Sequence, residues 1–183
     1  MSSLQGHFLV ASPRLPDENF YHTVVLMIQH TGEGAFGVVL NRPSGVTVGE
    51  VWQKVSETPC DSEVPVNVGG PVEGPLIAVH TEPTCSENEV LPGVYVATQK
   101  DFLDNVVTQK GRPFRVFSGY AGWAGGQLEG ELKMGGWLTM PATSDLIFGR
   151  EEDLWRAVTR AIGQDVLRGV FKDRKLPDDP SVN

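Results

Sequence analysis

The sequence is poor in cysteine, because its 183 residues include only Cys60 and Cys85. Neither belongs to a Cys-x-x-Cys pair, and no spacing of cysteine and histidine matches a zinc site. We expect both residues to be loop thiols without a metal-binding role. A redox pair requires the two sulfur atoms to be close in space, and the sequence leaves that alternative open.

Long apolar runs are also missing. No segment approaches the roughly 20 apolar residues that a transmembrane helix needs. Residues 1–12 lack the basic start and the long apolar stretch of a secretory signal peptide. These two absences predict a cytoplasmic protein that has no membrane partner.

Positive charge is scarce. The chain has 15 Lys and Arg against 23 Asp and Glu, which gives a formal net charge of −8. Non-specific binding to nucleic acid depends on basic side chains that neutralise phosphates, so direct nucleic-acid binding is disfavoured. Residues 150–175 contain 7 basic and 5 acidic side chains. This excess is too small to indicate a DNA-binding helix.

Glycine, in contrast, is abundant, with 21 residues that cluster most densely between Ser118 and Trp137. We predict that a strand at residues 114–117 ends in a glycine-rich bend at residues 119–126, followed by a short helix. Such glycines mark backbone that takes a positive φ or that another group approaches closely. The segment also contains Tyr120, Trp123, Gln127, Glu129 and Glu131, so it is either a ligand site or a tightly packed corner.

The order of the predicted elements indicates an α+β fold. An apolar hairpin spans residues 21–30 and 35–40, and Thr47 with Glu50 forms the capping box of a helix. Strands outnumber helices and do not alternate with them, which disfavours a doubly wound parallel sheet. The length fits one domain over residues 1–183, with residues 176–183 as a loose tail.

The C-terminal part of the chain predicts three further elements. A short strand is expected at residues 145–148. A continuous apolar face predicts a helix at residues 151–162. Gly163 separates it from a second short helix at residues 165–171.

The glycine-rich segments do not match a phosphate-binding loop. The glycines after residue 118 follow neither GxGxxG nor GxxxxGK[ST]. Glu129 and Glu131, near the start of the next helix, would repel a phosphate there. We interpret Gly69-Gly70-Pro71 as a tight turn between strands. No motif for a metal or a cofactor is present, and we expect neither.

Two histidines suggest an enzymatic alternative. His30 and His80 end predicted strands, where either is positioned to act as a base with Glu129 or Glu131 in a hydrolase. The other interpretation is a histidine whose ring is satisfied by hydrogen bonds at the end of a sheet. Ser118 has no GxSxG elbow around it.

One pair of polar side chains favours ligand binding instead. Gln127 and Glu131 are four residues apart on a predicted helix and therefore share a face. With Trp123 nearby, they form a candidate site for a small polar ligand or a capped corner.

Several short motifs follow one another over nearly the whole chain. They are P-x-L-x-D-x-x-F at residues 13–20, HTVV at 22–25 with His30, GVVLNRP at 37–43, GGPV at 69–72 with His80, GYAGW at 119–123 with QLE at 127–129 and Trp137, and Leu154-Trp155. In these motifs and in their order, the sequence resembles the bacterial YqgE/AlgH family. Each motif alone is modest, but their ordered combination is specific.

The resemblance implies an α+β fold with a bifurcated, largely antiparallel β-sheet folded into a pseudo-barrel and surrounded by helices. It brings no catalytic residue and no cofactor, and the function of the family is not established. One branch is named as a transcriptional regulator of alginate production, so a regulator of transcription is an alternative function.

The residue patterns and the resemblance together favour a binding or regulatory protein, monomeric or weakly dimeric, that takes a small molecule or a protein partner. Binding residues tend to lie in loops at strand ends. The ligand-binding candidates are Asn41, Arg42, Gly69, Gly70, His80, Tyr120, Trp123, Gln127 and Glu129.

Overall fold

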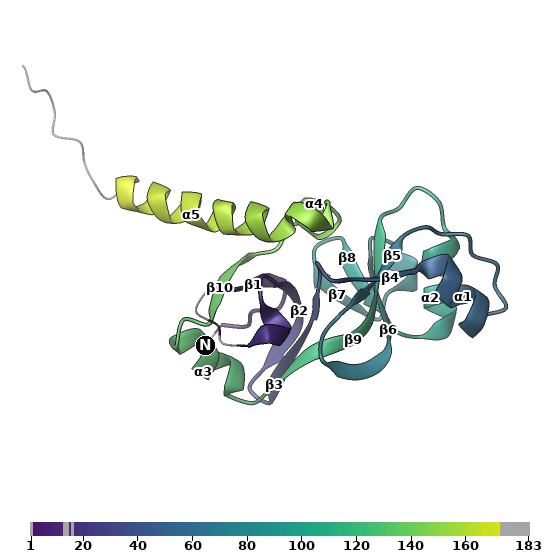
Figure 1. Ribbon diagram of the computed structural model, residues 1–183, viewed down its shortest axis with the longest axis horizontal. Coiled ribbons are helices and arrows are strands. Elements are labelled where there is room, and N and C mark those ends of the chain that lie inside the picture. Colours follow the sequence, from purple (N-terminus) through teal and green to yellow (C-terminus); the bar gives the residue numbers. More distant parts are fainter. Residues whose placement is uncertain (1, 13–14, 16, 173–183) are drawn as a thin grey trace, which may run out of the picture.

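The computed structural model describes residues 2–12, 15 and 17–172 (Figure 1). The predicted loose tail at residues 176–183 lies outside the described residues. In the described part, ten strands form one sheet. They are β1 (His7–Ala11), β2 (Val24–Thr31), β3 (Gly34–Val39), β4 (Pro43–Thr47), β5 (Pro65–Val68), β6 (Val72–His80), β7 (Asn88–Leu91), β8 (Val94–Ala97), β9 (Phe114–Ala124) and β10 (Trp137–Pro141).

The sheet splits at β9. Its main path runs β10-β1-β2-β3-β9-β6-β8-β7, and every pair along this path is antiparallel. Strand β9 also pairs in parallel with β5, which in turn pairs with β4. In Figure 1, β9 runs between the end of the molecule built on β1, β2 and β10 and the end built on β4 to β8. The bifurcated, largely antiparallel sheet curls into a half-barrel, which confirms the predicted fold.

Five α-helices surround the sheet in the described part of the chain. They are α1 (Val48–Val55), α2 (Lys100–Thr108), α3 (Gln127–Lys133), α4 (Ser144–Ile147) and α5 (Leu154–Lys172). Figure 1 shows α1 and α2 at the β4–β6 end, α3 at the opposite end, and α5 along one side, next to β10. The predicted capping box of α1 is confirmed, because Thr47 and Glu50 exchange hydrogen bonds.

Strand alternation distributes the apolar side chains between two faces of the sheet. On β1, Phe8 and Val10 join a core that includes Leu154 and Val158 of α5. Their neighbour Leu9 faces a second core. That core lies toward α3, and a third core lies under α1 and α2.

The predicted bend at residues 119–126 is wrong over most of its length. Strand β9 continues to Ala124, and residues 121–124 pair with β3. The chain turns only at Gly125 and Gly126, and Gly126 caps α3 with a φ of 80°. The expectation that another group approaches these glycines closely is met at Gly119, where an added Cβ would lie 2.7 Å from the carbonyl oxygen of Val72, but the glycines lie in a paired strand and not in a bend.

The C-terminal predictions also need correction. Residues 144–147 form a helical turn capped by the Thr143 side chain, not a strand. The two predicted helices are one helix, α5, and Gly163 lies inside it. A glycine within a helix costs only about 1 kcal/mol, which a long packed helix tolerates. No helix of the described residues is long and apolar enough to cross a membrane.

Candidate functional site

Asn41 fixes the end of β3 to the loop that precedes β2. Its Oδ1 accepts a hydrogen bond from the backbone N–H of Val24, and its Nδ2 donates to the carbonyl oxygen of His22, both at 2.9 Å. The next residue, Arg42, donates from Nη2 to the carbonyl oxygen of Tyr21 at 3.2 Å. The amide of Asn41 is therefore used inside the protein, and the Arg42 guanidinium keeps further N–H donors.

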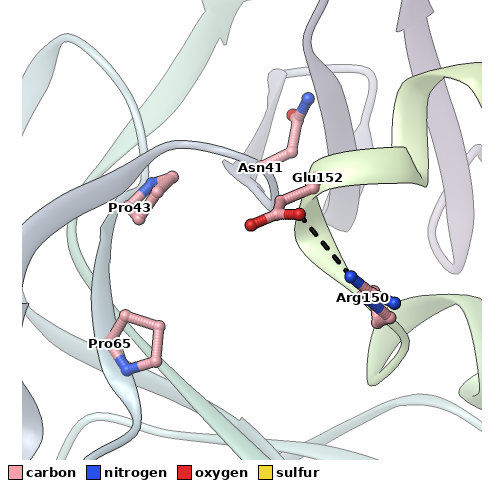
Figure 2. A pocket seen from close by; sticks show the side chains of 5 residues that line it. All are labelled: Asn41, Pro43, Pro65, Arg150 and Glu152. Atoms are coloured by element: carbon pink, nitrogen blue, oxygen red, sulfur yellow. Dashed lines mark ion pairs between the residues drawn. The ribbon is translucent and has the colours of Figure 1, made fainter.

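A hollow of about 470 Å³ opens beside this loop, and we call it the Asn41 hollow (Figure 2). Pro43 and Pro65 form one side, and Arg150 and Glu152 form the other, with Asn41 between them. Nη2 of Arg150 lies 3.6 Å from Oε2 of Glu152, and the two side chains are 83% and 85% exposed. Both charges are thus available to a ligand.

The two proline rings stand at the starts of paired strands. Pro43 begins β4 and Pro65 begins β5. Proline suits the first residue of a strand because it has no N–H to donate to the ladder. The β4–β5 pairing places both rings on this side of the Asn41 hollow.

A buried arginine holds the opposite side in place. Arg115 on β9 is 5% exposed, and its Nη1 donates to the carbonyl oxygen of Leu40 at 2.9 Å. Its Nη2 donates to the carbonyl oxygen of Gly149, next to Arg150. The guanidinium therefore ties the chain before α5 to the end of β3, and it brings residues more than 100 positions apart to one hollow.

Gly69 and Gly70 lie where the sheet splits. The Gly69 N–H donates to the carbonyl oxygen of Ser118, and the Gly69 carbonyl accepts from the N–H of Val39, both at 2.8 Å. A Cβ added to Gly70 would lie 2.2 Å from the carbonyl carbon of Tyr120. The chain passes so close to β9 that only glycine fits, and a role of these glycines in ligand binding stays a prediction.

Tyr120 and Trp123 line a different hollow of about 550 Å³, together with Phe36, Val72 and Gly122. The ring of Tyr120 meets the edge of Phe36, with centroids 6.1 Å apart. This hollow is mostly apolar, and it is separate from the Asn41 hollow in its lining residues.

The Glu131 carboxylate connects α3 to β9 and β10 through hydrogen bonds. Its Oε2 accepts hydrogen bonds from the indole N–H of Trp123 at 3.0 Å and of Trp137 at 2.8 Å. Its Oε1 accepts from Nε2 of Gln127 at 3.0 Å, so the predicted shared face of Gln127 and Glu131 is confirmed. Three donors occupy this carboxylate, which gives it a structural role.

His30 and Glu129 do meet, as the hydrolase hypothesis requires. Nε2 of His30 lies 3.0 Å from Oε1 of Glu129, while Nδ1 accepts from the backbone N–H of Leu4 at 3.0 Å. A backbone hydrogen bond at Glu129, followed by the bond from His30, lowers the pKa of the Glu129 carboxyl. Both nitrogens of His30 are occupied, so this geometry favours a structural histidine over a catalytic base.

His80 is fully buried at the end of β6. Its Nδ1 accepts a hydrogen bond from the backbone N–H of Glu82 at 3.1 Å, and its Nε2 has no hydrogen-bond partner among the described residues. Burial lowers the pKa of the imidazole, and the negative charge of Glu82 opposes this only in part. The ring is enclosed by the protein, and a role of His80 in ligand binding stays a prediction.

The two thiols are free, and both belong to the apolar cluster under α1 and α2. Sγ of Cys60 lies 3.7 Å from the carbonyl oxygen of Val107, and Cys85 is buried. Across residues 2–12, 15 and 17–172, no group of three His, Cys, Asp or Glu side chains is arranged to hold a metal ion.

The predicted site residues therefore separate into several places. Asn41 lines one hollow and Tyr120 with Trp123 lines another, while His80 is enclosed. Sequence reasoning missed Pro65, Arg150 and Glu152. Glu152 lay in the helix predicted at residues 151–162 and Arg150 just before it, and no candidate motif included Pro65.

The curled, split sheet with helices around it makes this chain an α+β protein. Residues 8–167 match the family model DUF179, described as AlgH-like, and the chain belongs to this family. It is 35% identical over 176 residues to a UPF0301 protein of Nitrosococcus oceani (92% of this chain, 94% of the relative). It is 37% identical over 171 residues to a UPF0301 protein of Myxococcus xanthus (90% and 94%).

Solved structures agree with the fold. The solution structure of the AlgH protein from Pseudomonas aeruginosa matches with a TM-score of 0.75 at 30% identity, covering 87% of this chain and 88% of that one. A crystal structure of a protein from Corynebacterium diphtheriae matches with a TM-score of 0.69 at 25% identity, covering 88% and 87%. These names assign no reaction and no ligand.

Proposed function

We propose that this protein is a binding protein whose site for a small molecule is the Asn41 hollow. The observation that supports this best is the convergence of three distant segments, which bring Pro43, Pro65 and the Arg150–Glu152 pair around one space of about 470 Å³. Ligand sites of small molecules typically measure about 300–1,000 Å³ and combine apolar walls with a few placed polar groups.

The charged side of the hollow suits a ligand with polar ends. An exposed ion pair contributes about 0–1 kcal/mol, so a ligand can replace it at little cost. Arg150 offers a fork of donors, and Glu152 offers two acceptor oxygens. The proline rings opposite offer apolar surface. A small molecule with both an acidic and a basic or amide group fits this arrangement best.

The cytoplasmic location, the monomeric or weakly dimeric state and a regulatory role belong to the same proposal. A regulatory protein needs a signal, and a small molecule in the Asn41 hollow would supply it. A protein partner is the alternative occupant, because the hollow is open to solvent.

The test is a thermal-shift screen of the purified protein against a panel of amino acids, nucleotides and other common metabolites. A ligand at 100 times its dissociation constant adds about 2.7 kcal/mol to the free energy of unfolding, which raises the melting temperature measurably. Arg150→Ala and Glu152→Ala should each weaken the shift. Arg156→Ala, an exposed arginine further along α5, is the matched control and should keep it.

Two results would contradict the proposal. One is a ligand whose thermal shift is the same in Arg150→Ala, Glu152→Ala and the wild type, because that ligand binds elsewhere. The other is a panel without any hit, which would favour a protein partner and make capture by the immobilised protein, with and without Arg150→Ala, the next measurement.

A further inference from the structure

His22 has a backbone conformation that side chains other than glycine rarely adopt. Its φ is 53°, and it is the only non-glycine residue of the described part with a positive φ. The left-handed region costs roughly 1–2 kcal/mol for such a residue. The Asn41 amide holds this conformation by binding both the His22 carbonyl and the Val24 N–H. Strain kept in place by a dedicated side chain is a feature of functional sites.

The strained residue stands in the middle of three stacked rings. The His22 imidazole lies 3.9 Å from the ring of Tyr21, at 22°, and 4.1 Å from the ring of Trp155, at 28°. Trp155 is anchored, because its Nε1 donates to the carbonyl oxygen of Ala11 at 3.3 Å. Tyr21 is the outer ring and is 65% exposed. No other ring of the described residues contacts it.

An unpaired guanidinium lies at the same place. Arg42 is bound to the Tyr21 carbonyl oxygen through Nη2, and no carboxylate of the described residues lies within ion-pair distance of it. Glu18, on the turn before Tyr21, is the acidic residue nearest to Tyr21 in the sequence. Arg42 therefore keeps free N–H donors while it binds the backbone of a residue whose ring is exposed, in a chain with a net charge of −8.

We propose that Tyr21 and Arg42 form a second binding site, which takes a planar ring that carries an anionic group, as in a nucleoside monophosphate or an aromatic carboxylate. The ring stacks on the open face of Tyr21, and the anionic group accepts hydrogen bonds from the Arg42 guanidinium. Aromatic faces bind planar rings, and arginine binds phosphate or carboxylate with two parallel hydrogen bonds.

A purely structural role explains only part of this arrangement. The contact of His22 with Trp155 and the bond from Trp155 to Ala11 help to attach α5 to the sheet, together with Leu154 and Val158 in the core. This attachment uses neither the exposed ring of Tyr21 nor the guanidinium of Arg42. The proposed site is independent of the Asn41 hollow, and either assignment can fail without the other.

Isothermal titration calorimetry with AMP tests the proposal, with adenosine and inorganic phosphate as fragments that lack one of the two features. Benzoate carries a carboxylate in place of the phosphate, so it tests whether a carboxylate serves as the anionic group. We expect AMP or benzoate to bind more tightly than phosphate alone. Tyr21→Ala should weaken that binding about tenfold or more, since stacking on one aromatic ring has this magnitude.

The variants separate the two contacts. Tyr21→Phe keeps the ring and should retain the affinity for AMP. Arg42→Gln should weaken the binding of AMP about tenfold and leave the binding of adenosine unchanged. Met134→Ala removes another exposed apolar side chain, on a different part of the surface, and is the control. Absence of binding by both AMP and benzoate would overturn the proposal. It would also be overturned if the Tyr21→Ala protein has the wild-type melting temperature and binds the ligand with the wild-type affinity.

Discussion

Gly69 faces the carbonyl oxygen of Gly119 so closely that a Cβ added to Gly69 would lie 2.1 Å from that oxygen. Both partners are backbone, so neither can move as a flexible side chain would. The contact arises because the chain at Gly69 binds Ser118 of β9 and Val39 of β3 at once. The GGPV and GYAGW motifs are therefore two sides of one backbone contact at the split in the sheet.

Gly69→Ala is expected to lower the free energy of unfolding by about 3 kcal/mol or more, because overpacking against fixed backbone has this cost. The measurement is urea unfolding followed by tryptophan fluorescence. Gly130→Ala is the control: no atom lies within 4 Å of its added Cβ, and alanine inside α3 should stabilise by about 0.5–1 kcal/mol. Equal free energies of unfolding for the two variants would show that the close contact at Gly69 does not limit the size of the residue there.

Local signals allowed several elements to be predicted from the sequence. The β2–β3 hairpin and the capping box of α1 depend on neighbouring residues, and both are confirmed. Strand β9 was predicted too short, because its glycines are explained only by the chain segment at residues 69–72 that approaches from elsewhere in the fold. The helical turn α4 was predicted as a strand, since four apolar-rich residues fit either structure.

The Asn41 hollow shows why a site is harder to predict than an element. Asn41 was a candidate and lines the hollow, and its amide binds Val24 and His22 within the protein. Arg150 lines the same space and follows Gly149, whose carbonyl oxygen Arg115 binds. No pattern of spacing along the chain indicates such a contact between residues so distant in sequence.

A carboxylate joins α1 to α2. Oδ1 of Asp104 accepts hydrogen bonds from Nε1 of Trp52 and Oγ of Ser56, both at 2.8 Å, and Oδ2 accepts from Nζ of Lys100 at 2.9 Å. Burial raises the pKa of the Asp104 carboxyl, but the bonds from Lys100, Ser56 and Trp52 outweigh it and lower this pKa from 3.8 to about 2.

Asp104 should therefore stabilise the fold above its unfolded pKa and lose this contribution as the pH falls through about 2. Asp104→Asn should lower the free energy of unfolding at pH 7 by about 1–2 kcal/mol, because a charged hydrogen bond is lost. Between about pH 4 and pH 2, the stability difference from the wild type should shrink. Urea midpoints measured at each pH test this, with exposed Asp101→Asn as the control. A difference that stays constant with pH would contradict it.

The burial of His80 predicts that the free energy of unfolding depends on pH in a different range. Burial lowers the pKa of the His80 imidazole in the folded state below the ordinary 6.5. Below pH 6.5 the unfolded chain binds a proton that the folded chain does not, so the free energy of unfolding falls with falling pH. The contribution of His80 is thus complete above about pH 6.5 and decreases toward the lowered pKa of the folded state.

His80→Leu should flatten this dependence, because leucine fills much of the same buried space without a titrating group. At pH 7 the variant loses the bond to the Glu82 N–H, which costs about 1 kcal/mol, but it also removes the unpartnered Nε2. Urea unfolding at pH 7 and pH 5 should give a smaller difference for His80→Leu than for the wild type. If His80→Leu keeps the wild-type difference, another group titrates in this range, and protonation of His80 does not destabilise the fold.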